Sequence, residues 1–268
     1  MNLGRIEPLV SAPVRRRHRY SWDLVTHLVG REFRLRYRRA LFGWLWAIGS
    51  PLARLVILIF VFTRVLPLGI PNYPVFVFSG LIAWMWFSAG LSSATSSALD
   101  RRDLLFRPGL PRAAVPVVSV LTDGLDYFAA LPILLLFLVL GDGVPVTALA
   151  LPVVLGVQLM LTLGLGYALC AANVYLRDVR LLVDIGTLLG FYLTPVFYSR
   201  ESVTAANPLV LDLNPMAHLL AAYRAILLPP GHLPELGPFL VLSAFCAAVF
   251  VGGYAIYRRV SPSFVDEI

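Results

Sequence analysis

Long apolar runs, separated by short polar segments, fill most of the chain after its first forty residues. A membrane-spanning α-helix needs about 20 consecutive, predominantly apolar residues. Runs of that kind lie at residues 44–66, 75–97, 113–140, 145–172, 181–199 and 237–257. The pattern therefore predicts an all-α integral membrane protein with six transmembrane helices.

The segment before the first run follows a different period. Between Ser21 and Ala40 the apolar residues recur at helical spacing, and charged residues fall on the opposite side. The apolar stripe consists of Trp22, Val25, Val29, Phe33 and Tyr37, and the polar side of Asp23, His27, Arg31, Arg34 and Arg38. We expect an N-terminal amphipathic interfacial helix whose arginines lie near anionic lipid headgroups. A plain topological anchor is the alternative.

The segment between the fifth and sixth runs, residues 200–236, holds apolar stretches that are too short to span a membrane. Asn207-Pro208, Asn214-Pro215 and Pro229-Pro230 interrupt them. Such broken pieces are typical of re-entrant helices, which are tolerated only where protein or a water-filled cavity covers the backbone. We expect an outer re-entrant helical segment, with an external loop carrying amphipathic patches as the alternative.

Arg224 lies within this outer segment, downstream of Asn214 and Pro215. Its guanidinium can bind a pyrophosphate through two parallel hydrogen bonds, or it can pair with Glu201, Asp212 or backbone carbonyls. An arginine in an apolar segment needs a partner, and we favour the structural pairing.

Composition agrees with a membrane protein, and the charges orient it. The chain is 59% hydrophobic and 14% charged, whereas soluble domains carry about 25% charged residues. All 22 basic residues are arginine, and 18 of them lie on one side of the spans if both termini are cytoplasmic. This positive-inside bias predicts a cytoplasmic tail with the amphipathic helix (1–43), a transmembrane domain (44–260) and a second cytoplasmic tail (261–268).

The residue types present exclude several classes of function. A Walker A site needs a lysine at the nucleotide phosphates, and this chain contains none. Cys170 and Cys246 lie in apolar runs, so we expect core residues rather than a disulfide framework. The four histidines lack ligand spacing, so no metal site is expected. The net charge of +7 flanks apolar spans rather than a soluble domain, which argues against a nucleic-acid partner.

Several short motifs, taken together in their order, carry a family resemblance. They are residues 34–39 (RLRYRR), 41–46 (LFGWLW), 50–52 (SPL), 106–108 (FRP), 110–112 (LPR), 177–179 (RDV), 194–198 (TPVFY), 214–215 (NP) and 223–224 (YR). This series resembles the ABC-2 type transport permeases, in the branch that exports O-antigen, teichoic acid and galactan. The first cytoplasmic loop departs from the family, which usually has a lysine before an aromatic-proline pair.

The resemblance implies a homodimeric channel in the bacterial plasma (inner) membrane, with both termini cytoplasmic. Each copy would bind one copy of a separate cytoplasmic ATPase, and that subunit would hold ATP and Mg, so no cofactor belongs to this chain. The cargo would be a polyprenyl-pyrophosphate-linked glycan that moves from the cytoplasmic to the outer side. Membrane lipids would be the remaining partner.

Two loops are candidates for coupling to the ATPase. The first, residues 99–112, has a charged head formed by Asp100, Arg101 and Arg102, followed by Leu105 and Phe106 as apolar anchors. A short helix of this kind can place apolar side chains in a partner's groove while its charges fix the register. The second contains Arg177 and Asp178, which can also pair with each other. An exposed loop without a partner is the alternative.

Aromatic residues in the second and fifth runs are candidates for lining the conduit. Sugar rings pack flat on aromatic rings, and Tyr and Trp can also hydrogen-bond passing hydroxyls. An ordinary interfacial aromatic belt is the alternative. The candidates are Trp84, Trp86, Phe87, Phe191, Tyr192, Phe197 and Tyr198.

Two other functions remain open at this point. An ABC-2 permease for drugs or lipids would share the same fold. An integral-membrane enzyme acting on polyprenyl phosphates is more distant, and it is suggested by Asp123 and Asp126, which are i, i+3 neighbours. A catalytic metal site would need a second cluster of ligands, which the short loops do not offer. Asp123, Asp126 and Asp184 are costly in hydrocarbon and should each face a partner or a wet cavity.

Overall fold

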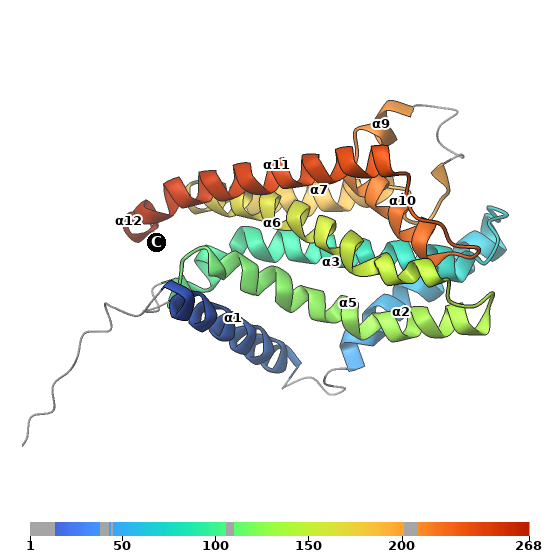
Figure 1. The fold of residues 1–268 in the computed structure, drawn as a ribbon, viewed down its shortest axis with the longest axis horizontal. Coiled ribbons are helices and arrows are strands. Elements are labelled where there is room, and N and C mark those ends of the chain that lie inside the picture. Colours follow the sequence, from blue (N-terminus) through green and yellow to red (C-terminus); the bar gives the residue numbers. More distant parts are fainter. Residues whose placement is uncertain (1–13, 38–42, 44, 106–109, 201–207, 268) are drawn as a thin grey trace, which may run out of the picture.

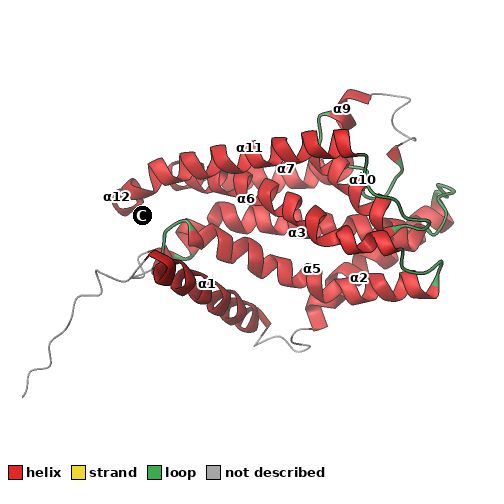
Figure 2. Ribbon diagram, viewed as in Figure 1, coloured by secondary structure: helices red, strands yellow, loops and turns green. Residues whose placement is uncertain are grey.

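The computed structural model describes residues 14–37, 43, 45–105, 110–200 and 208–267. Within these residues all regular structure is helical and no strand is present (Figures 1 and 2), which confirms the all-α prediction. The longer helices are α1 (Val14–Tyr37), α2 (Leu45–Phe60), α3 (Tyr73–Asp100), α5 (Ala114–Leu140), α6 (Leu151–Tyr175), α7 (Val179–Leu193), α10 (Pro215–Leu227) and α11 (Leu236–Val260). The short ones are η2 (Val61–Val65), α4 (Arg102–Leu105), η3 (Val146–Ala150), α9 (Pro208–Asp212), η4 (Ser261–Ser263) and α12 (Phe264–Glu267).

Five of the six predicted runs form helices long and apolar enough to cross a membrane. These are Leu45–Val65, Tyr73–Asp100, Ala114–Leu140, Val146–Tyr175 and Leu236–Ser263. The fifth run, 181–199, forms α7, which has only 15 residues. At 1.5 Å per residue α7 is about 22 Å long, less than the roughly 30 Å hydrocarbon core. It ends because Pro195 disfavours helical backbone at Thr194, which is extended.

Helix α3 is the centre of the bundle, and the other helices pack around it. It contacts α2, α5, α6, α7 and α10, and most of its side chains are buried. Figure 1 shows α2, α3, α5, α6, α7 and α11 running roughly side by side. A helix that is apolar on all sides is expected at such a central position.

The closest helix crossing joins α6 and α11 through two glycines. A Cβ built on Gly164 would lie 2.6 Å from the backbone nitrogen of Phe250, and one on Gly253 would collide with the carbonyl of Gly164. Lipid tails are as apolar as side chains, so helices in membranes associate largely through close packing at small residues. The pair Gly164 and Gly253 therefore fixes how α11 docks.

The charged loops gather at one end of the bundle, which we call the arginine end. The C-terminus and α12 lie at this end, with the loops that follow α3 and α6 (Figure 1). Arg112 donates to the carbonyl of Ser261 at 2.7 Å, and the Tyr257 hydroxyl donates to the Arg112 carbonyl at 3.1 Å. The arginines of this end are Arg101, Arg102, Arg112, Arg177, Arg180, Arg258 and Arg259.

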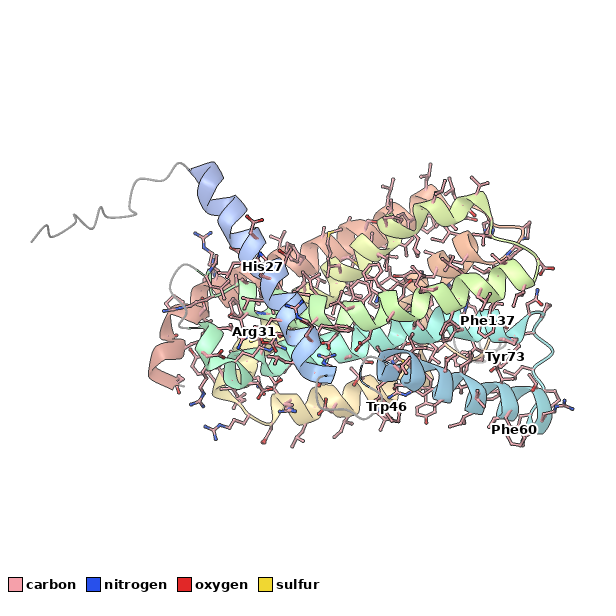
Figure 3. All side chains as sticks on the ribbon, turned by 90° about the horizontal axis from the view of Figure 1, so that it is seen from below. His27, Arg31, Trp46, Phe60, Tyr73 and Phe137 are labelled. Atoms are coloured by element: carbon pink, nitrogen blue, oxygen red, sulfur yellow. The ribbon has the colours of Figure 1, made fainter. Side chains whose placement is uncertain are left out.

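Helix α1 lies against the bundle beside α5, and Figure 3 shows it crossing at an angle, with His27 and Arg31 labelled. The predicted amphipathicity is confirmed, since Val25 and Val29 are buried while His27 and Arg31 are exposed. The stripe faces protein rather than lipid, because Val25, Leu28 and Val29 join a core cluster with α3, α5 and α6. The side chains of Trp22 and Tyr37 and the whole of Arg38 lie outside the described residues.

Replacing Gly253 by valine should prevent α11 from docking, because the added carbons meet the Gly164 backbone. Overpacking of this kind costs about 1–3 kcal/mol, and more where backbone must move. We expect a lower thermal unfolding temperature and a lower yield of monodisperse protein in detergent. Gly252→Val is the matched control, since a Cβ at Gly252 meets nothing within 4 Å. Equal losses in both variants would contradict the role of the crossing.

Candidate functional site

A cleft of about 440 Å³ opens between α2, α3 and α7. Helix α3 supplies the floor, and the other two helices supply the walls. The cleft is lined by Arg54, Ile57, Leu58, Leu81, Trp84, Met85, Ser88, Asp184, Thr187, Leu188, Phe191 and Tyr192. Three of the aromatic residues expected to line a conduit, Trp84, Phe191 and Tyr192, therefore meet at one opening, although more than 100 positions separate Trp84 from the others.

The aromatic rings continue from the cleft towards the end of α7. Trp84 contacts Phe191 edge to face, with ring centroids 6.3 Å apart. Gly190 allows this approach, since a Cβ there would lie 2.9 Å from the Trp84 ring. Phe191 then contacts Phe197 at 5.5 Å, and Phe197 contacts Tyr198 at 5.1 Å. Phe87 joins the series through Trp84 at 5.4 Å.

Two further aromatic residues extend this series. Phe62, in η2, stacks on Phe197 with centroids 5.0 Å apart, and Tyr73 donates its hydroxyl to the Phe197 carbonyl at 3.0 Å. In Figure 3, Phe60 and Tyr73 mark the end of α2 and the start of α3, while Trp46 marks the start of α2. Neither Phe62 nor Tyr73 was a sequence candidate, because both lie outside the two runs that the resemblance singled out.

Trp86 does not join this cluster. Its indole N–H donates to the Val120 carbonyl at 3.1 Å, and its ring contacts Tyr127 at 5.6 Å. Consecutive residues of a helix are about 100° apart, so two positions after Trp84 the side chain points to nearly the opposite face of α3. Trp86 packs between α3 and α5 and is only 5% exposed.

Two charged side chains line the cleft, one on the candidate span that contains α2 and one on the shorter helix α7. Arg54 comes from α2, and Asp184 comes from α7, where it accepts a hydrogen bond of 2.7 Å from the Ser92 hydroxyl. In the described part of the chain no ion pair joins Arg54 to Asp184. Charges at this depth require a partner or water. The cleft is thus polar on both walls.

The other intramembrane carboxylates are neutralised by α1. Arg36 donates to Asp123 at 2.6 Å and to Asp126 at 3.1 Å, and the Ser93 hydroxyl also donates to Asp123. Asp123 is only 4% exposed. The expectation that these carboxylates face a partner is confirmed, and the spacing that suggested a metal-dependent enzyme serves an ion pair. Among the described residues, no group of three or more histidine, cysteine or acidic side chains could hold a metal.

The outer segment is anchored by a helix cap and by Arg224. Asn214 accepts hydrogen bonds from the backbone N–H groups of Met216 and Ala217 at 3.0 and 3.4 Å, and Pro215 occupies the first turn of α10. The Asn214 amide also donates to Thr194 at 2.8 Å, which joins α10 to the end of α7. Helix α10 is largely buried, so other parts of the protein cover it.

Arg224 makes the structural contacts expected of it. Its guanidinium donates to the Val196 carbonyl at 2.8 Å and lies 3.6 Å from the centre of the Phe76 ring. Gly80 leaves the necessary room, since a Cβ there would be 3.0 Å from Arg224. Of the proposed carboxylate partners, Asp212 pairs with Arg200, and Glu201 lies outside the described residues.

The two candidate coupling loops contact each other and α1 at the arginine end. Arg101 pairs with Glu32 of α1 at 3.8 Å, and Asp100 pairs with Arg180 at 3.9 Å. Arg102, Arg177 and Asp178 are exposed. No ion pair joins Arg177 to Asp178 within the described chain, and the contact between the two loops is the pair of Arg180 with Asp100.

One predicted anchor has a different position. Leu105 is 3% exposed and packs in the core cluster of α1, α5 and α6 rather than presenting its side chain to a partner. The charged residues Asp100, Arg102 and Asp103 are exposed in this loop. Phe106 lies outside the described residues. The role of this loop in coupling stays a prediction.

Sequence comparisons identify the class of protein. The family model for the ABC-2 type transporter matches residues 23–228. The chain therefore belongs to the ABC-2 type transporter family, as the motifs indicated, and it is a membrane subunit of a transporter.

Three relatives, whose names describe them as a permease or transport protein for O-antigen or polysialic acid, match most of the chain. The chain is 33% identical to the O-antigen export system permease protein RfbA of Myxococcus xanthus, over 95% of this chain and 98% of the relative. It is 26% identical to the protein of the same name from Klebsiella pneumoniae, over 92% and 95% of the two chains. The polysialic acid transport protein KpsM of Escherichia coli is 26% identical over 85% and 90%.

Reversing the charge of Arg36 should detach α1. In Arg36→Asp three carboxylates face one another, one of them in Asp123 at 4% exposure. Breaking a buried pair costs roughly 3–5 kcal/mol, but the partial exposure of Arg36 reduces this to about 1–3 kcal/mol. The measurement is thermal unfolding in detergent. Asp123→Arg in the same chain should restore part of the loss, and a double variant no better than Arg36→Asp would contradict the pairing.

Proposed function

We propose that this chain is the channel subunit of an ATP-driven exporter for a polysaccharide of the O-antigen, galactan or teichoic-acid type. The match to O-antigen export permeases over nearly the whole chain carries the proposal. The cargo is a polyprenyl-pyrophosphate-linked glycan, and the energy comes from two copies of a separate cytoplasmic ATPase. The lack of lysine supports this division, because a Walker A site cannot form in this chain.

The proposed topology has six crossings with the arginine end in the cytoplasm of the bacterial inner membrane. Helix α7 and the residues up to Tyr198 together make the fifth crossing. Helices α9 and α10 form the outer re-entrant segment, and Asn214 and Arg224 hold it against α3 and α7. The clustering of arginines at one end supports this orientation.

The conduit is proposed to form where the clefts of two copies face each other. Large apolar side chains on α2 and α7 are exposed beside the cleft, among them Ile57 at 62% and Leu188 at 60%. A second copy would cover these faces and enclose Arg54 and Asp184, which require a wet or paired environment. The cleft would then become a closed, partly polar passage.

The aromatic rings suit a polymer that slides. Stacking on one ring contributes about 0.5–1.5 kcal/mol beyond area burial, so each sugar is held weakly and released easily. Tyr192, which is 60% exposed, and the half-buried Phe191 offer such surfaces at the cleft, and Trp84, only 6% exposed, packs edge to face against Phe191. An exporter of a drug or lipid would instead need one enclosed pocket for a single amphiphile.

The topology predicts opposite labelling of two exposed loops. In a variant whose native cysteines are replaced by alanine, Asp142→Cys should react with a membrane-impermeant maleimide added to spheroplasts. Asp178→Cys should react only after the membrane is opened, because it lies at the arginine end. The reverse pattern would contradict the orientation.

Removing the rings of Trp84, Phe191 and Tyr192 together should slow glycan export. The triple alanine variant loses the rings that line the cleft, while the proposed contacts with the ATPase lie in the loops at the arginine end of the bundle. The readout is surface glycan in a deletion strain complemented with each variant at matched expression.

Phe128→Ala is the control for this experiment, since Phe128 is an exposed aromatic of α5 outside the cleft. We expect normal export from it. Export at the wild-type level in the triple variant would contradict the role of the cleft aromatics.

A further inference from the structure

A second groove, outside the proposed conduit, lies between α10 and the first half of α11, the end of the bundle opposite the arginine end (Figure 1). It consists of two adjoining cavities of about 420 and 530 Å³. They form one groove because both are lined by His218, Pro238 and Leu242. The groove exists because, beyond His218, the facing side of α10 carries the small residues Ala221, Ala222 and Ala225.

The groove has charged side chains near the start of α11 and an apolar face further along that helix. Asp212 lines the second cavity but pairs with Arg200 of the first. The first cavity contains Arg200, His232 and Glu235, close to where α11 begins at Leu236. The second contains Val241 and Phe245, which are 71% and 51% exposed. Phe245 lies nine residues into a membrane-spanning helix, about 14 Å from its start at 1.5 Å per residue. A polar mouth above an apolar trough is the shape that a membrane lipid fills.

The charges at the polar mouth indicate the kind of headgroup. Among the described lining residues, Arg200 carries the positive charge, and Asp212 and Glu235 carry negative charges. Arg200 pairs with Asp212, and the His218 imidazole lies 2.9 Å from the Asp212 carbonyl. Glu235 precedes α11 and lines the same cavity as Arg200. A headgroup that carries both a phosphate and a cation matches this pattern better than a purely anionic one.

We propose that this groove binds a phospholipid with a phosphoethanolamine headgroup. The phosphate accepts hydrogen bonds from Arg200 and His232, and the ammonium donates to the Glu235 carboxylate. One acyl chain follows Val241 and Phe245 into the hydrocarbon. The lipid then fills the side of α10 that protein leaves open, and holds α10 against α11.

The test uses the purified full chain, stripped of lipid in detergent, with dioleoyl phosphatidylethanolamine as the probe. Native mass spectrometry counts the lipids bound per chain, and thermal unfolding measures the stabilisation. We expect saturable binding and a raised unfolding temperature. Ala221→Trp fills the floor of the groove, and Glu235→Gln removes the partner of the ammonium. Glu235→Gln should weaken binding by about tenfold through the loss of one charge-assisted contact, and Ala221→Trp should weaken it by at least as much because the indole occupies the groove.

Leu240→Trp is the matched control, because Leu240 is exposed on α11 but does not line the groove. It should bind the lipid as the wild type does. Wild-type binding in Ala221→Trp would overturn the site.

Two other lipids test which headgroup the groove recognises and whether its occupant is a phospholipid or the lipid carrier of the cargo. Equal affinity for phosphatidylglycerol, unchanged in Glu235→Gln, would overturn the assignment of the amine. Displacement of the phospholipid from the groove by a polyprenyl phosphate at equal concentration would mean that the carrier of the cargo is the occupant instead. None of these measurements involves glycan or ATPase, so their outcome is independent of the proposed export function.

Discussion

Hydrocarbon offers no hydrogen-bond partners, and this constraint determines where the chain places its polar groups. Asp123 is tolerated between helices because Arg36 and Ser93 satisfy it. Gln158, buried in α6, donates to the carbonyl of Ala83 at 3.0 Å. Arg224 donates to the carbonyl of Val196, and this hydrogen bond connects α10 to the residues that follow α7. Each of these three contacts joins segments that are far apart in the sequence, so these polar groups help to fix the arrangement of the bundle.

The cleft between α2, α3 and α7 departs from this rule. Arg54 and Asp184 face a common opening, and their surroundings within one chain are largely apolar and exposed. Asp123, Asp126 and Arg224, by contrast, find their partners inside the chain. The exception marks the surface that is completed from outside, by water, cargo or a second copy. For this reason the cleft, rather than the small cavity around Asp123, is the centre of the proposed export path.

The sequence predicted the elements well, and it predicted long-range contacts poorly. Apolar runs gave five spans because length and hydropathy are local properties. The early end of α7 has a local signal in Pro195, which the apolar run concealed. The separation of Trp84 from Trp86 also follows from helical geometry alone. By contrast, the partner of Asp123 lies 87 positions away, and no local pattern points to Arg36. Leu105 looked like a surface anchor because its burial depends on where α1 docks.

The central claim is that the cleft between α2, α3 and α7 is a water-filled path for the glycan. Cysteine accessibility tests it most directly. In a chain without native cysteines, Thr187→Cys lies in the cleft, and Leu136→Cys lies on the exposed apolar face of α5. A small aqueous thiol reagent should label Thr187→Cys in membranes that contain the assembled transporter, and glycan trapped during export should protect it. Leu136→Cys should stay unlabelled. Failure of both positions to react, with and without cargo, would mean that lipid fills the cleft and that the glycan crosses elsewhere.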